Sequence, residues 1–186
     1  MKLLRTVRLD RSDTFVFAKA AEPGEWATSG AFMFWDDDPT ALDGKTRAAF
    51  RSGFLGLSTF GWSTLVEVAE AKSADIDAIA ETLARKLVDE HGAPDSEAAR
   101  AAATEEIEFS ASLAGHPLGT VIALQRTVEQ DGSVRERFRT IKTALEPGAN
   151  TFAQGCVQPI GIARDDDPDA PRIEEVDFVG LMEQRK

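Results

Sequence analysis

Residues 122–140 read IALQRTVEQDGSVRERFRT, and this stretch does most to decide the fold. Apolar and polar residues alternate on both sides of Asp131-Gly132. Alternation at a period of two is typical of a half-buried strand, because successive side chains of a strand point to opposite faces. An Asp-Gly pair between two such runs is a strong signal for a tight turn. The stretch therefore predicts an antiparallel β-hairpin.

The register of this hairpin depends on the length of its turn, since a slip of one residue moves every side chain to the other face. A two-residue loop at 131–132 would place Val128 opposite Arg135 and mix apolar with charged side chains. A three-residue loop at 130–132, with Gly132 in the left-handed conformation of a bulge, sorts the two faces. The pairs on one face are then Val128 with Val134, Arg126 with Glu136, Leu124 with Phe138 and Ile122 with Thr140. We predict this second register.

The same register places three arginines, Arg135, Arg137 and Arg139, side by side on the other face. One interpretation is a solvated sheet face, on which the arginines pair with nearby acids and their stems shield the sheet. The other is a binding site for a small anion or an acidic protein partner, because guanidinium groups hold carboxylates and phosphates through two parallel hydrogen bonds. The sequence leaves both interpretations open.

The rest of the chain predicts further strands and two long helices. We predict strands at 3–9, 14–18, 30–35 and 63–71, a loop at 22–30, a short helix at 45–53, and long helices at 73–91 and 94–113. Gly92 is expected to end the first long helix and Pro94 to begin the second. Strands, two adjacent helices and then strands again are typical of an α+β fold. We expect a single domain over residues 1–186, with a mostly antiparallel sheet and an αα-hairpin packed on one face.

The charge balance excludes some classes of partner. The chain of 186 residues carries 32 acidic and 21 basic side chains, a net charge of −11. Binding to nucleic acid or to an anionic membrane requires a basic surface, so we expect neither partner. Arg5 and Arg8 interrupt the segment where a signal peptide needs apolar residues, and no stretch approaches the ~20 apolar residues of a membrane span. Cys156 is the only cysteine, which excludes an internal disulfide and fits a cytoplasmic protein.

The sequence DDDP occurs twice, at 36–39 and at 165–168. Hard cations prefer clustered oxygen ligands, so Asp36, Asp37 and Asp38 are candidate metal ligands. Neither copy has the ligand spacing of a calcium-binding loop. Adjacent aspartates before a proline also begin turns and helices, which is the structural alternative.

Other catalytic patterns are incomplete. Ser58 lies in GLSTFG, one residue away from the spacing of a nucleophile elbow, and a serine nucleophile needs a base. The chain offers only His91 and His116 for that role. The DGKT at 43–46 resembles the end of a phosphate-binding loop, but Pro39 stands where that loop requires glycine. No catalytic constellation can be assembled, and no cofactor is predicted.

Four segments of the chain are distinctive: LLRTVRLDRSDTFVF, AAEPGEWATSGAFMFW, AFRSGFLGLSTFGWSTLVEV and GHPLGTVIALQRTVE. Together they resemble a family of small bacterial proteins of unknown function, over about the first three quarters of the chain. The resemblance supplies no activity, cofactor or catalytic residue for any position of this sequence. It implies an accessory role beside a biotin/lipoate ligase-like protein.

From these observations we expect a non-catalytic binding or accessory module, which takes a protein partner or a small anionic ligand at the arginine row. The first alternative is a hydrolase or transferase that uses a divalent metal at Asp36, Asp37 and Asp38 and acts on an anionic substrate. The second alternative is a homo-oligomeric structural protein, with a homodimer as its simplest form.

Overall fold

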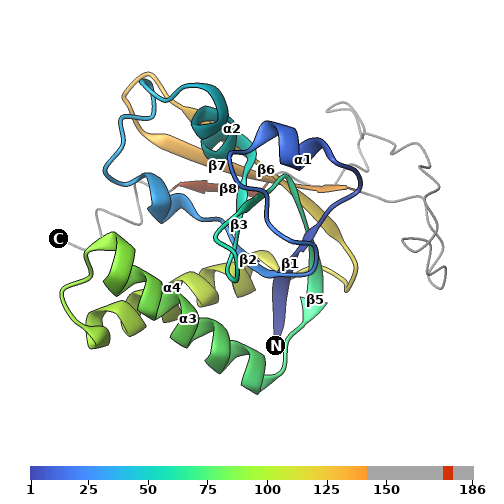
Figure 1. Ribbon diagram of the computed structural model, residues 1–186. Helices are drawn as coiled ribbons and strands as arrows, with labels where there is room; N and C mark the ends of the chain where they lie inside the picture. Colours follow the sequence, from blue (N-terminus) through green and yellow to red (C-terminus); the bar gives the residue numbers. More distant parts are fainter. Residues whose placement is uncertain (142–173, 178–186) are drawn as a thin grey trace.

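The computed structural model describes residues 1–141 and 174–177, and these residues are built around an antiparallel sheet. Eight strands of these residues form one curled sheet in the order β4-β3-β2-β1-β5-β6-β7-β8 (Figure 1). The strands are β1 (Lys2–Val7), β2 (Trp26–Thr28), β3 (Phe54–Gly56), β4 (Trp62–Ser63), β5 (Leu65–Glu70), β6 (Val121–Val128), β7 (Val134–Ile141) and β8 (Glu174–Asp177). All neighbouring strands of this sheet run antiparallel.

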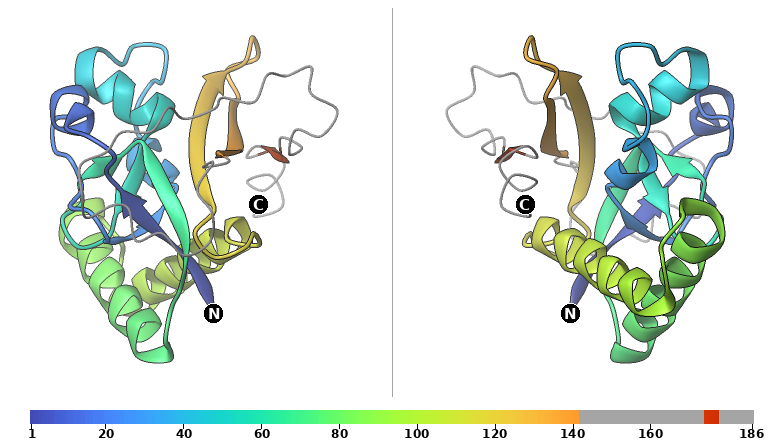
Figure 2. Two further views of the ribbon diagram at one scale, coloured as in Figure 1. Left: turned by 90° about the vertical axis from the view of Figure 1, so that its right-hand side faces the viewer. Right: turned by 90° about the vertical axis from the view of Figure 1, so that its left-hand side faces the viewer.

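The helices of the described residues are α1 (Ser12–Val16), the short 3-10 helix η1 (Ala31–Phe34), α2 (Gly44–Ser52), α3 (Ser73–His91) and α4 (Ser96–Leu113). Two views show α3 and α4 lying together at one end of the sheet, with α1 and α2 at the opposite end (Figure 2). In this hairpin of helices α4 packs directly against β1 and β2. The predicted α+β fold with a packed αα-hairpin is thus confirmed. None of the described helices is both long and apolar enough to cross a bilayer.

The ends of the two long helices follow from local capping. Gly92 ends α3 in the left-handed conformation, with a φ of 68°, as predicted. Asp95 begins α4, because its carboxylate accepts a hydrogen bond of 2.8 Å from the backbone N–H of Ala98. Helix α4 therefore starts at Ser96, two residues after the predicted start at Pro94.

Residues 14–18 were predicted to be a strand, and this prediction is wrong. Residues 12–16 form the short helix α1. The carboxylate of Asp13 is buried, and it accepts hydrogen bonds from the backbone N–H and the hydroxyl of Thr64, at 3.2 and 2.6 Å. Phe17, directly after the helix, is buried as well. These tertiary contacts outweigh the β-propensity of the aromatic and β-branched residues.

The predictions for residues 22–35 are also wrong. A short strand, β2, lies in the predicted loop at 22–30, and η1 replaces the predicted strand at 30–35. Gly30 turns the chain between them with a φ of 71°. A Cβ atom on Gly30 would lie 2.6 Å from the Cβ of Leu55. Glycine is therefore required both by the positive φ and by the close approach of Leu55. The apolar side chains of this segment therefore project from η1 and not from a strand, and Phe32 is buried in the core.

The predicted register of the β6–β7 hairpin is confirmed. The two strands pair Val128 with Val134, Arg126 with Glu136, Leu124 with Phe138 and Ile122 with Thr140. Gly132 has a φ of 85°, which is the left-handed conformation that the three-residue loop demands. The arginine row lies on the other face, with Arg135 and Arg137 half-buried and Arg139 exposed.

The core consists of two clusters of buried side chains, and β1 contributes neighbouring residues to both. Leu3 packs into the cluster that contains residues of α3 and α4, such as Leu83. Leu4 packs into the second cluster with Phe54. The second cluster continues along β6 and β7 through Leu124 and Phe138, whose next neighbours on the same face are Arg126 and Glu136. This face of the hairpin leads from the core to the candidate site.

Candidate functional site

A pocket of about 250 Å³ lies where the turn of the β6–β7 hairpin meets the loop between η1 and α2. The hairpin turn and that loop lie side by side at one end of the sheet (Figure 1). The pocket is lined by Ala31, Phe34, Trp35, Asp37, Pro39, Phe50, Arg126, Gly132, Ser133, Val134 and Glu136. Segments that are far apart in the sequence therefore build its walls.

A buried ion pair belongs to the pocket lining, together with the polar residues Asp37 and Ser133. Arg126 Nε donates a hydrogen bond to Oε1 of Glu136, directly across β6 and β7. Both side chains have 0% exposure to solvent. Taking two charges out of water carries a large desolvation penalty, which their mutual attraction offsets only when the remaining donors and acceptors are also satisfied.

All three nitrogens of the Arg126 guanidinium have partners. Nη1 donates to the backbone carbonyls of Phe50, at 2.8 Å, and Gly53, at 3.2 Å, at the end of α2. Nη2 donates to the carbonyl of Ser29, just after β2. These bonds tie β6 to two other segments of the chain and leave the guanidinium with little freedom to move.

Glu136 is less completely satisfied than its partner. Its Oε2 is buried and has no hydrogen-bond partner among the described residues. A buried acceptor without a donor costs about 1–3 kcal/mol, so such an atom in a folded protein calls for an explanation. Because the side chain has 0% exposure, Oε2 is closed off from the pocket as well as from solvent.

Aromatic side chains form much of the opposite wall. Phe34 and Phe50 meet edge to face, with ring centroids 5.4 Å apart. Trp35 stands at the rim with 60% of its surface exposed, and its ring and that of Phe32 are T-shaped, with centroids 6.4 Å apart. A large exposed indole beside a pocket is an unusual use of an apolar side chain, and such residues are enriched at binding surfaces.

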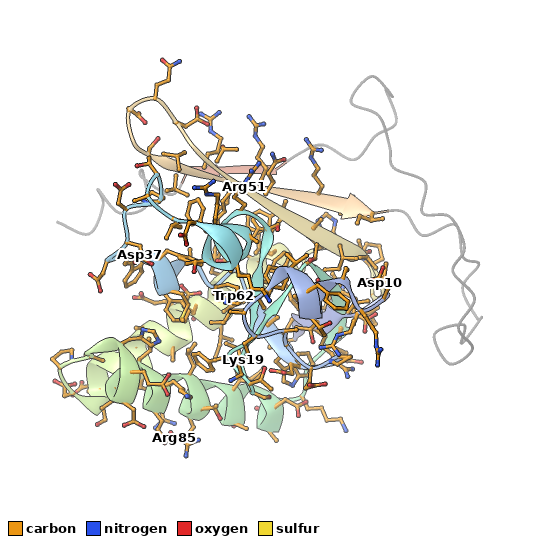
Figure 3. All side chains as sticks on the ribbon, turned by 45° about the horizontal axis from the view of Figure 1, so that its top comes forward. Asp10, Lys19, Asp37, Arg51, Trp62 and Arg85 are labelled. Carbon is orange, nitrogen blue, oxygen red and sulfur yellow. The ribbon has the colours of Figure 1, made fainter. Side chains whose placement is uncertain are left out.

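The aspartates predicted as metal ligands lie beside this pocket. Asp36, Asp37 and Asp38 are exposed on the loop after η1, and Asp37 belongs to the pocket lining (Figure 3). Oδ1 of Asp38 accepts hydrogen bonds from the backbone N–H and the hydroxyl of Thr40, and these bonds hold the pKa of Asp38 below its usual range. Among the described residues, no group of three or more His, Cys, Asp or Glu side chains could hold a metal ion. The second DDDP, at 165–168, and Cys156 lie outside the described residues.

The pocket does not include the arginine row. Arg135, Arg137 and Arg139 point away from the face that carries Arg126 and Glu136. Arg135 pairs with Glu129 at 3.7 Å on the same hairpin. The added strand β8 runs along β7 and places Asp177 opposite Arg135 and Glu175 opposite Arg137 in the register.

The residues considered for nucleophilic catalysis have structural contacts. Ser58 is exposed, and its backbone N–H donates to Oε2 of the buried Glu25 at 2.9 Å. His91 packs edge to face on Phe32 at 5.9 Å, and the carbonyl of His116 accepts a hydrogen bond of 2.7 Å from Lys2. Ser58 and His116 thus lie in loops, and His91 is the last residue of α3.

Sequence reasoning placed Arg126 opposite Glu136 but treated the pair as one cross-strand contact among several. The signal that could have marked it is a charged pair that continues an apolar face, next to Leu124 and Phe138. The aromatic wall could not be found in this way, because the segment containing Phe34 and Trp35 was predicted to be a buried strand.

A comparison with protein families identifies one match. The model of a family described as "Family of unknown function (DUF6505)" matches residues 1–156. The chain therefore belongs to this family, as the sequence resemblance suggested. No curated protein and no solved structure matches the chain.

Proposed function

We propose that this member of the DUF6505 family is a non-catalytic binding module, and that its site is the pocket beside Arg126 and Glu136. The observation that supports it is the indole of Trp35, which is 60% exposed at the rim of a pocket whose wall contains Phe34 and Phe50. Small-molecule sites combine apolar and aromatic walls with a few fixed polar groups, and this lining has that composition.

The energetics of the ion pair favour a role beyond stability. Replacing a buried ion pair by apolar side chains of similar volume is often neutral or stabilising, by up to about 4 kcal/mol. By this argument, stability alone does not account for the pair. The hydrogen bonds of Arg126 to Ser29, Phe50 and Gly53 would hold this wall of the pocket in one shape before a ligand binds.

The lining itself favours binding over catalysis. Among the described residues, the pocket contains no histidine, cysteine or lysine. Its charged groups are the Arg126–Glu136 pair, whose charges balance, and the exposed Asp37. Covalent catalysis needs a nucleophile activated by a base within hydrogen-bond reach, and Ser133 is the single hydroxyl of the described lining.

The experiment is a screen of single-ring fragments against the full chain by ligand-observed NMR, with the melting temperature as a second readout. Trp35→Ala should abolish or strongly weaken the binding of the fragments, because it removes the aromatic rim. Phe15→Ala is the matched control, since Phe15 is an exposed aromatic residue on α1, outside the pocket lining. Hits whose affinity is unchanged in Trp35→Ala, or a screen without hits, would count against this function.

A second candidate function is the docking of an acidic protein segment on the arginine row. The observation in its favour is the register of β8, which brings Asp177 and Glu175 of the chain itself opposite Arg135 and Arg137. Because β8 already pairs with β7, an acidic partner would bind the arginine row through its side chains, by charge complementarity.

Titration of a labelled acidic peptide against the full chain tests this docking function. The variant Arg135→Glu/Arg137→Glu/Arg139→Glu should lose binding, and raising the salt concentration should weaken it. The control Arg11→Glu/Arg51→Glu/Arg85→Glu changes the net charge equally at exposed arginines outside β7. Equal loss in both variants would indicate a response to net charge and not a site.

A further inference from the structure

We infer the chemical class of ligand that this pocket takes: a small organic cation with a methylated, quaternary ammonium head. This ligand class rests on the proposed binding function and adds the charge and the hydration of the ligand to it. Three features of the molecule point to it: the exposed aromatic rim, the acidic residues on two sides of the pocket, and the apolar inner wall.

The indole of Trp35 is the group that a ligand cation would contact at the rim. Its 60% exposure leaves ring surface open, and Phe34 and Phe50 continue the aromatic wall inward. The face of an aromatic ring attracts cations, most strongly in tryptophan. Among the described residues, cations of the chain itself lie over the rings of Trp26 and Phe60, but none lies over Trp35. The indole at the rim is therefore open to a cation from outside.

Acidic side chains flank the pocket on two of its walls. Asp36 and Asp37 are exposed on the loop after η1, and Asp37 belongs to the lining. Asp131 is exposed in the hairpin turn, directly before the lining residues Gly132 and Ser133. No lysine or arginine of the described residues lies within ion-pair distance of these three carboxylates. The rim thus carries negative charge that the described part of the chain does not neutralise at short range.

The other charges around the pocket do not offset these acids. Arg126 and Glu136 are in contact with 0% exposure, so their charges largely cancel. Arg51 on α2 is exposed and is not part of the lining. Hydrogen bonds from Ser133 hold the pKa of Asp131 below its usual range, so this carboxylate is ionised at neutral pH. A cation gains attraction at this rim and an anion is repelled, although exposure to solvent keeps each contribution small.

The inner wall decides which kind of cation fits. Its apolar side chains are Ala31, Phe34, Pro39, Phe50 and Val134. A primary ammonium group is strongly hydrated and needs hydrogen-bond acceptors when it leaves water, and these side chains offer none. A quaternary ammonium group has no N–H and presents methyl groups to the wall. The cavity of about 250 Å³ is below the ~300–1,000 Å³ that is usual for drug-sized ligands, which suits a head group of this size.

Three probes with the same hydroxyethyl chain separate charge from hydration in the wild-type full chain. Choline carries the trimethylammonium head, 3,3-dimethylbutan-1-ol is its neutral carbon isostere, and ethanolamine carries a primary ammonium group. NMR titration measures the three dissociation constants. We expect choline to bind at least about fivefold more tightly than either of the others, because the ring face and the acidic rim both favour it. Raising the salt concentration should weaken choline binding and leave the neutral isostere unchanged.

Variants assign this preference to the rim. Asp36→Asn/Asp37→Asn should weaken choline by about threefold and leave 3,3-dimethylbutan-1-ol unchanged, because it removes charge and keeps shape. The matched control is Glu70→Gln/Asp77→Asn, which removes the same charge from exposed positions outside the lining, at the end of β5 and on α3. Trp35→Ala should weaken both probes. Trp35→Phe should lose part of the choline affinity and keep that of the isostere.

The outcomes distinguish the ligand class from the binding function itself. Equal affinity of choline and its isostere, with both weakened in Trp35→Ala, overturns the charge requirement and leaves an apolar binding site. Ring fragments that bind through Trp35, without any binding of choline, overturn the cationic class in the same way. Ethanolamine that binds as tightly as choline overturns the hydration requirement, and equal losses of choline in the two double variants overturn the role of the rim. If neither these probes nor the fragments show binding that depends on Trp35, the proposed function fails.

Discussion

Arg126 and Glu136 face each other across β6 and β7 and are both fully buried, on the face of the hairpin that leads from the core to the pocket. The guanidinium donates to four acceptors, three backbone carbonyls from two other segments and the carboxylate, while one carboxylate oxygen has no partner among the described residues. The asymmetry matters because a buried acceptor without a donor costs about 1–3 kcal/mol of stability.

Glu136→Gln is expected to destabilise the fold by about 3–5 kcal/mol, because it leaves the guanidinium of Arg126 buried without its counter-charge. Urea unfolding measures the difference. The double variant Arg126→Met/Glu136→Leu removes both charges and should recover most of this loss. A single variant within about 1 kcal/mol of the wild type would show that the pair is solvated in solution.

Gly132→Val is expected to lower the stability by about 1–2 kcal/mol, because a β-branched residue resists positive φ. The space around Gly132 is open, so the effect isolates the backbone conformation from steric contact. Gly132→Asn is the matched control and should lose less, since asparagine tolerates the left-handed region. The same unfolding temperature for Gly132→Val and the wild type would argue against the three-residue loop.

Glu25→Gln tests whether a buried carboxylate organises the turn at 57–61. Oε2 of Glu25 accepts the backbone N–H groups of Ser58 and Thr59, at 2.9 and 2.8 Å, and Oε1 accepts the hydroxyl of Thr59 at 2.7 Å. Hydrogen bonds to a charged group contribute roughly 1.5–3 kcal/mol, and we expect a loss of stability of about this size. The exposed Glu22 provides the control Glu22→Gln. Equal losses in the two variants would contradict the role given to Glu25.

Asp95→Ala is expected to destabilise α4 by about 0.5–2 kcal/mol, since the first turn loses the acceptor for the N–H of Ala98. Circular dichroism during thermal unfolding measures the change. Ser96→Ala is the control, because Ser96 is the first helical residue and not the cap. If Ser96→Ala has the larger effect, the helix begins at a different residue in solution.

Local patterns predicted those elements whose conformation is decided by near neighbours. The β6–β7 register followed from side-chain alternation and the turn length, and Gly92 ended its helix as expected. Residues 14–18 and 30–35 resisted prediction for the opposite reason. The helix α1 depends on the contact of Asp13 with Thr64, and the turn at Gly30 depends on the closeness of Leu55. Neither partner is close in the sequence, so no local pattern could signal them.

The same distinction separates the two candidate sites. By itself, the sequence determined that Arg126 lies opposite Glu136 and that the arginine row shares the other face, because the two-residue period of a strand assigns each side chain to a face. Tertiary structure alone decided that the pair is buried, since burial depends on α2 and the segment after β2 covering that face. Desolvation and hydrogen-bond satisfaction are properties of the assembled environment, and they turn one cross-strand pair among several into a buried ion pair beneath a pocket.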